Sequence, residues 1–296
     1  KGNLFMRYFG KTGMKIKRVG FGGIPIQRIS QEDTNKVIDE LEKCGVNFID
    51  TARGYTVSEE YLGNALKGRR EKFYIATKSM SRDYESMKRD IEISLKNLQT
   101  DYIDLYQMHN VKPAEYDTLF GEDKAYRALL EAKEQGKIKH IGITSHGLET
   151  VEKAVESDKF ETIQFPYNIV ENQADEVFKR AYEKGVGTIV MKPLAGGAID
   201  DGTLAMKYLL SREYIDVAIP GMDSPQQVIE NTDVLQNYEL TEEDNKKIAK
   251  IKSELGTNFC RRCEYCLPCP KGINIPQNFL LEGYYNRYNL KDWAVD

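Results

Sequence analysis

The sequence has no apolar run that approaches the roughly 20 residues a membrane-spanning helix requires. It also has no tract of basic residues. With 42 Lys and Arg against 46 Asp and Glu, the net charge is -4, which gives no positive field for holding nucleic acid. We recognise no secretory leader and therefore expect a cytoplasmic protein. Neither a membrane nor a nucleic acid is an expected partner.

Cysteine is scarce outside one short segment. Four of the five cysteines fall within ten residues, at Cys260, Cys263, Cys266 and Cys269, and Pro270 follows the last. Such clustering indicates a metal site in a reducing compartment better than it indicates a disulfide framework. The fifth, Cys44, stands alone in a predicted helix, where a thiol usually acts as a small core side chain.

What the chain does have is a regular alternation of strand and helix patterns, and its 41% of hydrophobic residues is enough for a large core. A short β-hairpin is predicted at 6–18. The predicted strands that follow are 19–22, 46–50, 73–78, 102–108, 138–143, 162–165, 187–191 and 215–219. The predicted helices are 30–44, 58–66, 84–98, 122–135, 148–157, 174–184, 202–211, 225–234 and 241–255.

Eight strands separated by helical crossovers indicate a parallel α/β sheet, either closed or open. A closed (β/α)8 TIM barrel needs about 250 residues, which leaves a short appendix in a chain of 296. An open dinucleotide-binding sheet would place G-x-G-x-x-G after its first strand, but the segment 20–23 reads only G-x-G-G. We therefore predict a barrel over residues 6–255 and a Cys-rich metal-binding extension over 256–296.

Three chemically complementary side chains stand where successive predicted strands end: Asp50, Lys78 and His109, with Tyr55 five residues after the first. In a barrel these strand ends meet on one face, the face that carries active sites. Asp50 can hold the Lys78 ammonium in place, and an ammonium beside a phenol makes its proton easier to give up. Tyr55 would then act as a general acid, with His109 orienting a substrate oxygen.

These residues resemble the aldo-keto reductase superfamily. The resemblance rests on the D-T-A-R-G-Y block at 50–55, on Ser58 and Glu59, and on Lys78 and His109, and it runs from about residue 6 to 255. It implies a TIM barrel that reduces small-molecule aldehydes and ketones with NADP(H) or NAD(H). It also implies a catalytic tetrad of Asp50, Tyr55, Lys78 and His109, in which Tyr55 is the proton donor.

The same resemblance implies a set of cofactor-binding positions. They are Gly22, Gly23, Asp50, Thr144, Ser145, Gln164, Met191, Lys192, Pro193, Leu194, Gly221, Gln227 and Asn231. Members that select the 2′-phosphate of NADP usually carry Lys or Arg where this chain has Gly221 and Gln227, so NAD stays open beside NADP. Lys192 and Arg212 are the alternative cations in the sequence.

The cysteine run has three C-x2-C spacings in series, which four thiolates could use for a [4Fe–4S] cluster or for one zinc ion. A continuous series with a trailing proline favours the cluster. The tail also resembles the ferredoxin-like end of some bacterial and archaeal members. Nicotinamide releases two electrons together as a hydride, whereas a cluster accepts one electron at a time. Any metal here would therefore either stabilise the fold of the tail or serve a separate redox partner.

Two rival functions remain open from the sequence. One is a nucleotide-sensing binding protein that reports cofactor state to a partner through the tail. The other is an electron-transfer protein in which the metal centre does the work.

Overall fold

Eight parallel strands form one curled sheet in the computed structural model, which describes residues 6–255, 260, 266–286 and 291–295. The strands are β3 (Phe21–Gly22), β4 (Phe48–Asp50), β5 (Tyr74–Ser79), β6 (Ile103–Met108), β7 (Ile138–Thr144), β8 (Thr162–Pro166), β9 (Gly187–Met191) and β10 (Val217–Ala218). Each pairs with its neighbour in chain order. Parallel bridges from Val19 to Ala218 and from Gly22 to Gly221 join the first strand to the last, so the sheet closes into a barrel.

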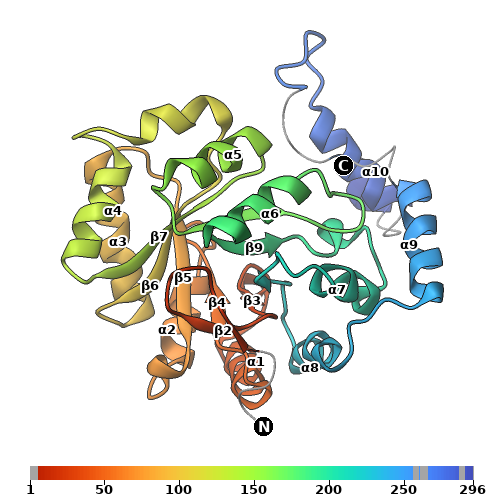
Figure 1. Ribbon diagram of the computed structural model, residues 1–296, viewed down its shortest axis with the longest axis horizontal. Helices are drawn as coiled ribbons and strands as arrows, with labels where there is room; N and C mark the ends of the chain where they lie inside the picture. The colour runs from red at the N-terminus through yellow and green to blue at the C-terminus, as the bar shows by residue number, and fades with distance from the viewer. Residues whose placement is uncertain (1–5, 256–259, 261–265, 287–290, 296) are drawn as a thin grey trace.

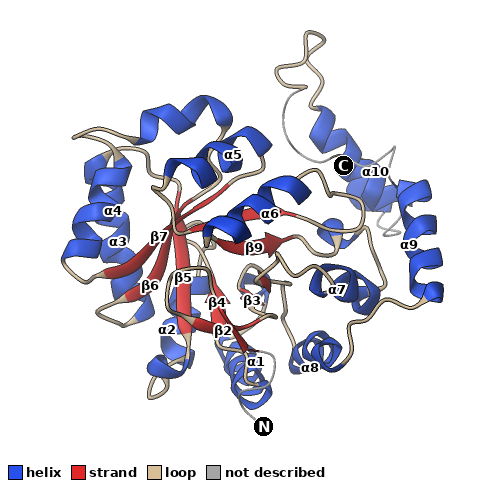
Figure 2. Ribbon diagram, viewed as in Figure 1, coloured by secondary structure: helices blue, strands red, loops and turns tan. Residues whose placement is uncertain are grey.

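Helices surround this barrel, as Figures 1 and 2 show. They are α1 (Gln31–Cys44), α2 (Ser58–Ala65), α3 (Tyr84–Leu98), α4 (Ala125–Glu134), α5 (Leu148–Ser157), α6 (Asp175–Lys184), α7 (Gly202–Leu210), α8 (Pro225–Asp233) and α9 (Glu242–Leu255). Short 3-10 turns lie at Pro25–Arg28, Arg70–Lys72, Pro113–Leu119, Ala195–Gly197 and Val234–Gln236. The α/β architecture is therefore the predicted one, although the first and last strands are shorter than predicted.

The helix ends follow from their capping residues. Ser30 precedes α1 and its hydroxyl accepts a hydrogen bond from the Asp33 amide at 3.0 Å. Gly45 ends α1 in the left-handed conformation, at φ 73°, which a residue without a Cβ adopts most easily. Asp83 caps α3 and Ser224 caps α8 in the same way as Ser30 caps α1.

A hairpin closes the amino end of the barrel. Strands β1 (Met6–Tyr8) and β2 (Lys15–Lys17) pair antiparallel, as predicted for 6–18. The hairpin buries Phe9 against Phe48, with ring centroids 5.4 Å apart, and packs Ile16 into the same cluster. A Cβ on Gly187 would lie 2.7 Å from the Phe9 ring, so the plug fits tightly. Ligands must therefore enter at the other end, where the strands terminate.

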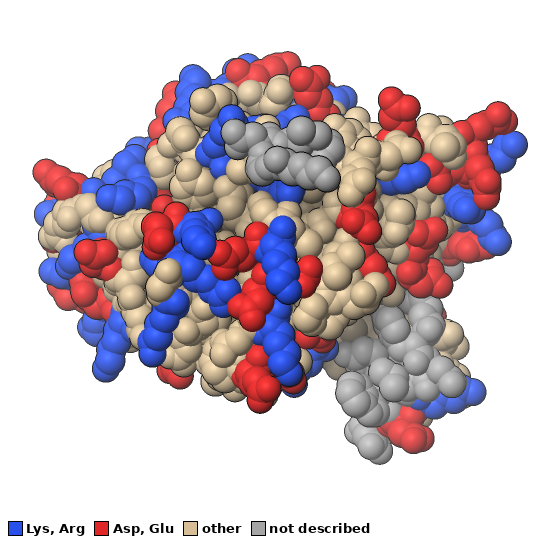
Figure 3. Space-filling model, turned by 90° about the horizontal axis from the view of Figure 1, so that it is seen from below, with Lys and Arg blue, Asp and Glu red and all other residues tan. Residues whose placement is uncertain are grey.

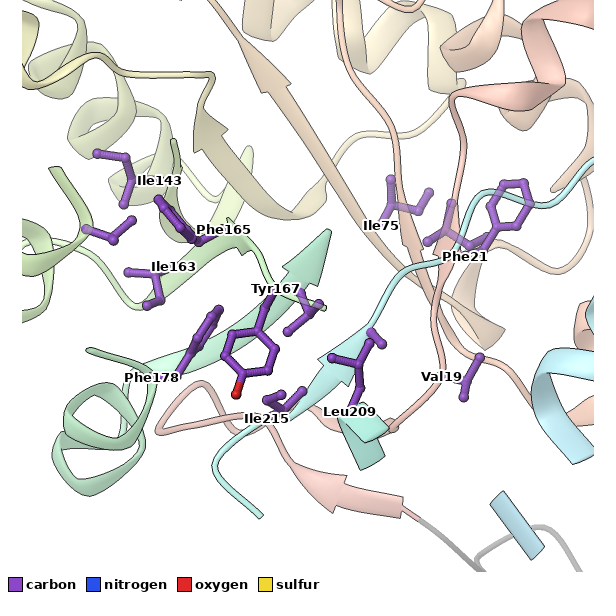
Figure 4. Close-up of a cluster of buried hydrophobic side chains, with 14 of the residues drawn as sticks. Val19, Phe21, Ile75, Ile143, Ile163, Phe165, Tyr167, Phe178, Leu209 and Ile215 are labelled. Carbon is purple, nitrogen blue, oxygen red and sulfur yellow. The ribbon is translucent and has the colours of Figure 1, made fainter. Parts of the chain in front are cut away.

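A larger apolar layer lies between the sheet and its helices. Figure 4 shows Ile163 and Phe165 of β8 near Phe178 of α6, while Ile75 of β5 and Phe21 of β3 lie on another part of the barrel. These side chains are buried, and each contributes roughly 1.5–3 kcal/mol to folding. The outer surface is different: Figure 3 shows acidic and basic side chains interspersed, with no expanse of one sign on that face.

The chain beyond α9 projects from the side of the barrel in Figures 1 and 3. It contains two helices that the sequence analysis did not predict, α10 (Ile275–Asn286) and α11 (Lys291–Val295). No described helix is both long and apolar enough to cross a bilayer.

Candidate active site

A buried ion pair lies at the carboxyl ends of two adjacent strands. Asp50 ends β4, Lys78 lies near the end of β5, and Lys78 Nζ is 2.5 Å from Asp50 Oδ2. Their side chains are only 3% and 2% exposed. Burial acts to lower the pKa of Lys78, but Asp50 and then Tyr55 outweigh it, and the net effect raises the pKa above its usual value. Lys78 is therefore charged at neutral pH.

Two buried glutamines donate hydrogen bonds to Asp50. Its other carboxylate oxygen, Oδ1, accepts hydrogen bonds from Gln107 Nε2 at 2.9 Å and from Gln164 Nε2 at 3.2 Å. Gln164 Nε2 also approaches Gln107 Oε1 at 3.0 Å. Because both oxygens are bonded, the carboxylate is held in one orientation inside the barrel. The sequence analysis did not single out Gln107.

Tyr55 and His109 lie over this pair. The Lys78 ammonium is 4.8 Å from the centroid of the Tyr55 ring. The Tyr55 and His109 rings meet edge to face, with centroids 6.1 Å apart and planes at 87°. The four residues predicted to share one pocket are thus neighbours, although they come from the ends of three strands, β4, β5 and β6.

His109 is a neutral imidazole at physiological pH. Burial, followed by the nearby charges of Lys78 and Arg82, lowers its pKa from 6.5 to about 3. Its Nδ1 is buried and has no hydrogen-bond partner among the described residues. A ring in this state can exchange hydrogen bonds with a ligand, but it is a poor source of protons in the neutral range.

The loop that carries Tyr55 is fixed by a second buried network. Arg53 Nη1 bonds Glu59 Oε1 at 2.9 Å, and Thr77 Oγ1 donates to Glu59 Oε2 at 2.9 Å. Ser58 Oγ donates to the carbonyl of Gly23 at 3.0 Å, which joins the loop to the first strand. Glu59 is 1% exposed, so this support lies beneath the site.

A cavity of about 420 Å³ opens beside Tyr55. It is lined by Gly22, Gly23, Ile24, Pro25, Arg28, Asp50, Tyr55, Gln164, Met191, Lys192, Pro193, Leu194, Gly196, Gly197, Ile219, Pro220 and Gly221. A Cβ on Gly22 would lie 2.7 Å from the Ile219 carbonyl oxygen, so glycine is needed where the two backbones approach. Apolar walls with a few polar groups suit an extended nucleotide.

Comparisons with known proteins show the family of the chain. The model of the aldo/keto reductase family matches residues 18–203. The chain belongs to the aldo/keto reductase family. It is 26% identical to L-galactose dehydrogenase of Arabidopsis thaliana, covering 84% of this chain and 94% of the relative. It is 29% identical to methylglyoxal reductase DkgA of Escherichia coli, covering 77% and 88%.

Solved structures of aldo-keto reductases share the fold of this chain. The holo form of the aldo-keto reductase AKR11C1 from Bacillus halodurans superposes with a TM-score of 0.74 at 25% identity, covering 84% of this chain and 96% of that one. The family and these relatives establish an NAD(P)-dependent oxidoreductase that reduces carbonyl groups. They do not favour the sensing or electron-transfer functions considered above.

Three of the predicted cofactor-binding positions, Gln164, Thr144 and Ser145, occupy two environments in this aldo/keto reductase. Gln164 lines the cavity, but its amide also bonds Asp50 and Gln107. Thr144 Oγ1 accepts from the Asn110 amide at 2.8 Å. Ser145 Oγ donates to the Val111 carbonyl at 2.5 Å. Thr144 and Ser145 are buried, and these bonds shape the loops after β6 and β7.

The far end of the cavity offers a different cation from those considered in the sequence. Arg212 does not serve there, because its guanidinium stacks 3.6 Å from the Tyr208 centroid and its Nε donates to the Tyr167 hydroxyl at 2.9 Å. Arg28 lines the cavity instead, with its side chain 73% exposed and 4.0 Å from Asp223. No sequence pattern pointed to Arg28, which is the last residue of the short 3-10 turn Pro25–Arg28.

The remaining predicted cofactor positions lie on α8. Gln227 is in its first turn, where its side-chain oxygen accepts a hydrogen bond from the Asp223 amide at 2.7 Å. Asn231 lies one turn further on and is half-buried. Neither residue lines the described cavity, whereas Gly221, before the helix, does.

The predicted metal ligands are described only in part. Cys260, Cys266 and Cys269 belong to the described chain, whereas Cys263 lies outside it. Within the described ranges, no group of three or more His, Cys, Asp or Glu side chains is arranged to hold a metal ion. Because Cys263 lies outside these ranges, the four-cysteine set stays a prediction.

Proposed function

We propose that Tyr55 is the proton donor in carbonyl reduction and that Asp50, Lys78 and His109 are its catalytic partners. The observation that carries this is the buried Lys78 ammonium, fixed by Asp50 and 4.8 Å from the Tyr55 ring centroid. A cation held there stabilises the phenolate that remains after Tyr55 releases its proton. No solvent rearrangement is needed, since the pair is already buried.

Each residue then has one task. NAD(P)H supplies, when bound, a hydride to the carbonyl carbon. Tyr55 gives its hydroxyl proton to the carbonyl oxygen, so one hydride and one proton yield the alcohol. Lys78 stabilises the phenolate, and Asp50 keeps the ammonium in place. Neutral His109 hydrogen-bonds the substrate oxygen and leaves the proton transfer to Tyr55, because its own pKa is about 3.

The cavity supports the proposed nucleotide site. Its glycine-bordered wall at Gly22 and Gly23 leads from Tyr55 toward Gly221 and the start of α8. Asp50, Gln164 and the 191–194 segment line it, as the resemblance implied. The proposed cofactor is NADP(H) or NAD(H), with Arg28 as the candidate partner of a 2′-phosphate. Thr144, Ser145, Gln227 and Asn231 stay proposed contacts.

Replacing Tyr55 with Phe tests the assignment. We expect Tyr55→Phe to lower kcat by about 10²–10⁴-fold with small aldehydes, because general-acid catalysis contributes on that order. The dissociation constant for NADPH, followed by its fluorescence, should stay within about twofold. Tyr126→Phe is the matched control, because Tyr126 lies on α4 and bonds the Lys159 carbonyl away from the cavity. Parent-level turnover by Tyr55→Phe would sink the proposal.

The substrate is proposed to be a small carbonyl compound. The relatives act, by their names, on methylglyoxal and on L-galactose, so both are suitable first members of a substrate panel. Each should be assayed in the reducing and the oxidising direction with both nucleotides.

We further propose that Cys260, Cys263, Cys266 and Cys269 bind a [4Fe–4S] cluster in the extension 256–296, with zinc as the alternative. Four thiolates are the donor set that either centre needs. Anaerobically prepared protein should contain about four iron and four sulfide per chain, and Cys266→Ser should lose them. Cys44→Ser is the control, since Cys44 lies at the end of α1. One zinc per chain and no sulfide would select the alternative.

A further inference from the structure

Three residues just past the ends of three strands form a hydrogen-bonded chain beside the cavity. His146 Nδ1 lies 2.8 Å from Asn110 Oδ1, and His146 Nε2 lies 2.8 Å from Lys192 Nζ. Asn110 follows β6 and adjoins His109, His146 follows β7, and Lys192 follows β9 and lines the cavity. The four proposed catalytic residues do not include any of the three.

The donor and acceptor chemistry admits one arrangement. A lysine ammonium can only donate, so Nε2 of His146 must accept and carry no proton. In a neutral imidazole the proton is then on Nδ1, which donates to the Asn110 side-chain oxygen. If the side-chain amide of Asn110 were flipped, its NH2 group would face the Nδ1–H donor of His146. Asn110 thus fixes the tautomer that lets His146 hold the ammonium of Lys192.

Both flanking residues have an unusual backbone. Asn110 has φ 50° and Lys192 has φ 54°, in the left-handed region that costs a non-glycine residue roughly 1 kcal/mol or more. The surroundings hold them there. The Asn110 amide donates to Thr144 Oγ1 at 2.8 Å, and the Lys192 carbonyl accepts from Asn168 Nδ2 at 3.0 Å. Asn168 is fully buried, so the anchor is rigid.

The charge of the cavity indicates what this chain of residues is for. Among its described lining residues, the cationic side chains are Arg28 and Lys192, and the acidic one is Asp50. Lys78 pairs with Asp50, and Arg28 lies 4.0 Å from Asp223, while Lys192 brings a basic group to the cavity wall. A dinucleotide carries its negative charge on phosphates, and a lysine is a point-charge partner for a phosphate.

We propose that His146, held by Asn110, is a positioning residue that presents the Lys192 ammonium to a phosphate of the bound dinucleotide. The inference rests on the nucleotide dependence of the enzyme and adds two residues to the cofactor site. It also places the support for the cofactor next to His109 in the chain, since Asn110 follows it directly.

Dissociation constants for NADPH and NADH, measured by fluorescence without substrate, test the inference. Lys192→Met should raise both constants about 10- to 100-fold, the range expected for losing a hydrogen bond to a charged group. His146→Ala should raise them about three- to tenfold. The double variant should match Lys192→Met within twofold, because His146 acts through Lys192, whereas independent effects would multiply.

His140→Ala is the matched control. His140 lies on the same strand, β7, and pairs with Glu161 at 2.8 Å away from the cavity, so its loss should leave both constants unchanged. Thermal unfolding of every variant separates weaker binding from unfolding. A His146→Ala constant within twofold of the parent, or multiplying effects in the double variant, overturns the proposal.

A substrate carboxylate is the other anion that Lys192 could hold. Unchanged nucleotide constants in Lys192→Met, together with a KM raised only for carboxylate-bearing aldehydes, would overturn the phosphate assignment. Failure of the parent protein to bind either nucleotide would remove the reductase function itself, and this inference with it.

Discussion

Removing Asp50, the negative partner of the buried pair, should lower the free energy of unfolding. Asp50→Asn leaves the Lys78 ammonium, 2% exposed, without a counter-charge. Breaking a buried pair by removing one partner costs roughly 3–5 kcal/mol. Lys78 keeps one acceptor, the Thr51 carbonyl at 2.9 Å, and Asn can still accept from Gln107, so we expect a loss near the lower end, about 3 kcal/mol.

The pH dependence sharpens this expectation. In the parent, the folded pKa of Lys78 is raised, so the stability it contributes is present below the unfolded value of 10.5 and is lost as pH rises through the folded pKa. In Asp50→Asn the larger of the two influences that raise this pKa is gone and only Tyr55 still opposes burial, so we expect the folded pKa of Lys78 to fall below 10.5. That variant should therefore recover stability as pH rises from 7 toward 10, whereas the contribution of Lys78 in the parent stays constant over that range.

Urea denaturation at a series of pH values measures both effects. Lys246→Met is the control, because its pair with Glu242 is exposed on α9 and such surface pairs contribute little. The double variant Asp50→Asn, Lys78→Met should be more stable than Asp50→Asn alone, since it leaves no buried charge. A loss below about 1 kcal/mol in Asp50→Asn, with no change of pH slope, would refute the reasoning.

Three further predictions concern other parts of the site. The folded pKa of His109 is about 3 against 6.5 unfolded, so the stability that neutral His109 contributes is present above pH 6.5 and is lost as pH falls toward 3, by about 1.4 kcal/mol per pH unit. In urea denaturation at a series of pH values, His109→Gln should therefore lose less stability than the parent between pH 6.5 and 3. Arg28→Ala should raise the dissociation constant for NADPH about tenfold and leave that for NADH within twofold; equal effects would separate Arg28 from the 2′-phosphate. Gly23→Ala would set a Cβ 2.8 Å from the Asp50 carbonyl and should destabilise by roughly 1–3 kcal/mol while lowering kcat, as denaturation and steady-state assays would show.

The barrel was predictable because local signals agreed with one another. Helix α1 shows this: Ser30 caps it, Gly45 ends it, and its buried residues recur at helical spacing. The shorter first and last strands were not predictable in their bounds. Val19 reaches Ala218 only through an isolated bridge at the closure of the barrel, and no local pattern encodes where such a ladder stops.

The sequence predicted the site residues that stand at strand ends. It did not predict those whose role depends on contacts between strands or loops distant in the chain. Asp50, Lys78 and His109 are visible because a polar residue after an apolar strand is unusual. Gln107 sits inside β6, where one glutamine carries no signal until its register opposite Lys78 is known. The contact between His146 and Lys192 joins residues 46 positions apart, and only the paths of two loops bring them together.

The two buried networks suggest why the loop 50–59 needs charge beneath it. A buried ion pair is on balance no more stabilising than apolar packing of the same volume, so stability alone does not explain two of them. What the two networks supply is a fixed position for each end of the loop 50–59. Asp50 and Lys78 fix the start of the loop, and Arg53 with Glu59 fixes its end, while Tyr55 between them stays half-buried. A hydroxyl that must meet a substrate cannot be locked by its own internal bonds, so the fixed points have to flank it.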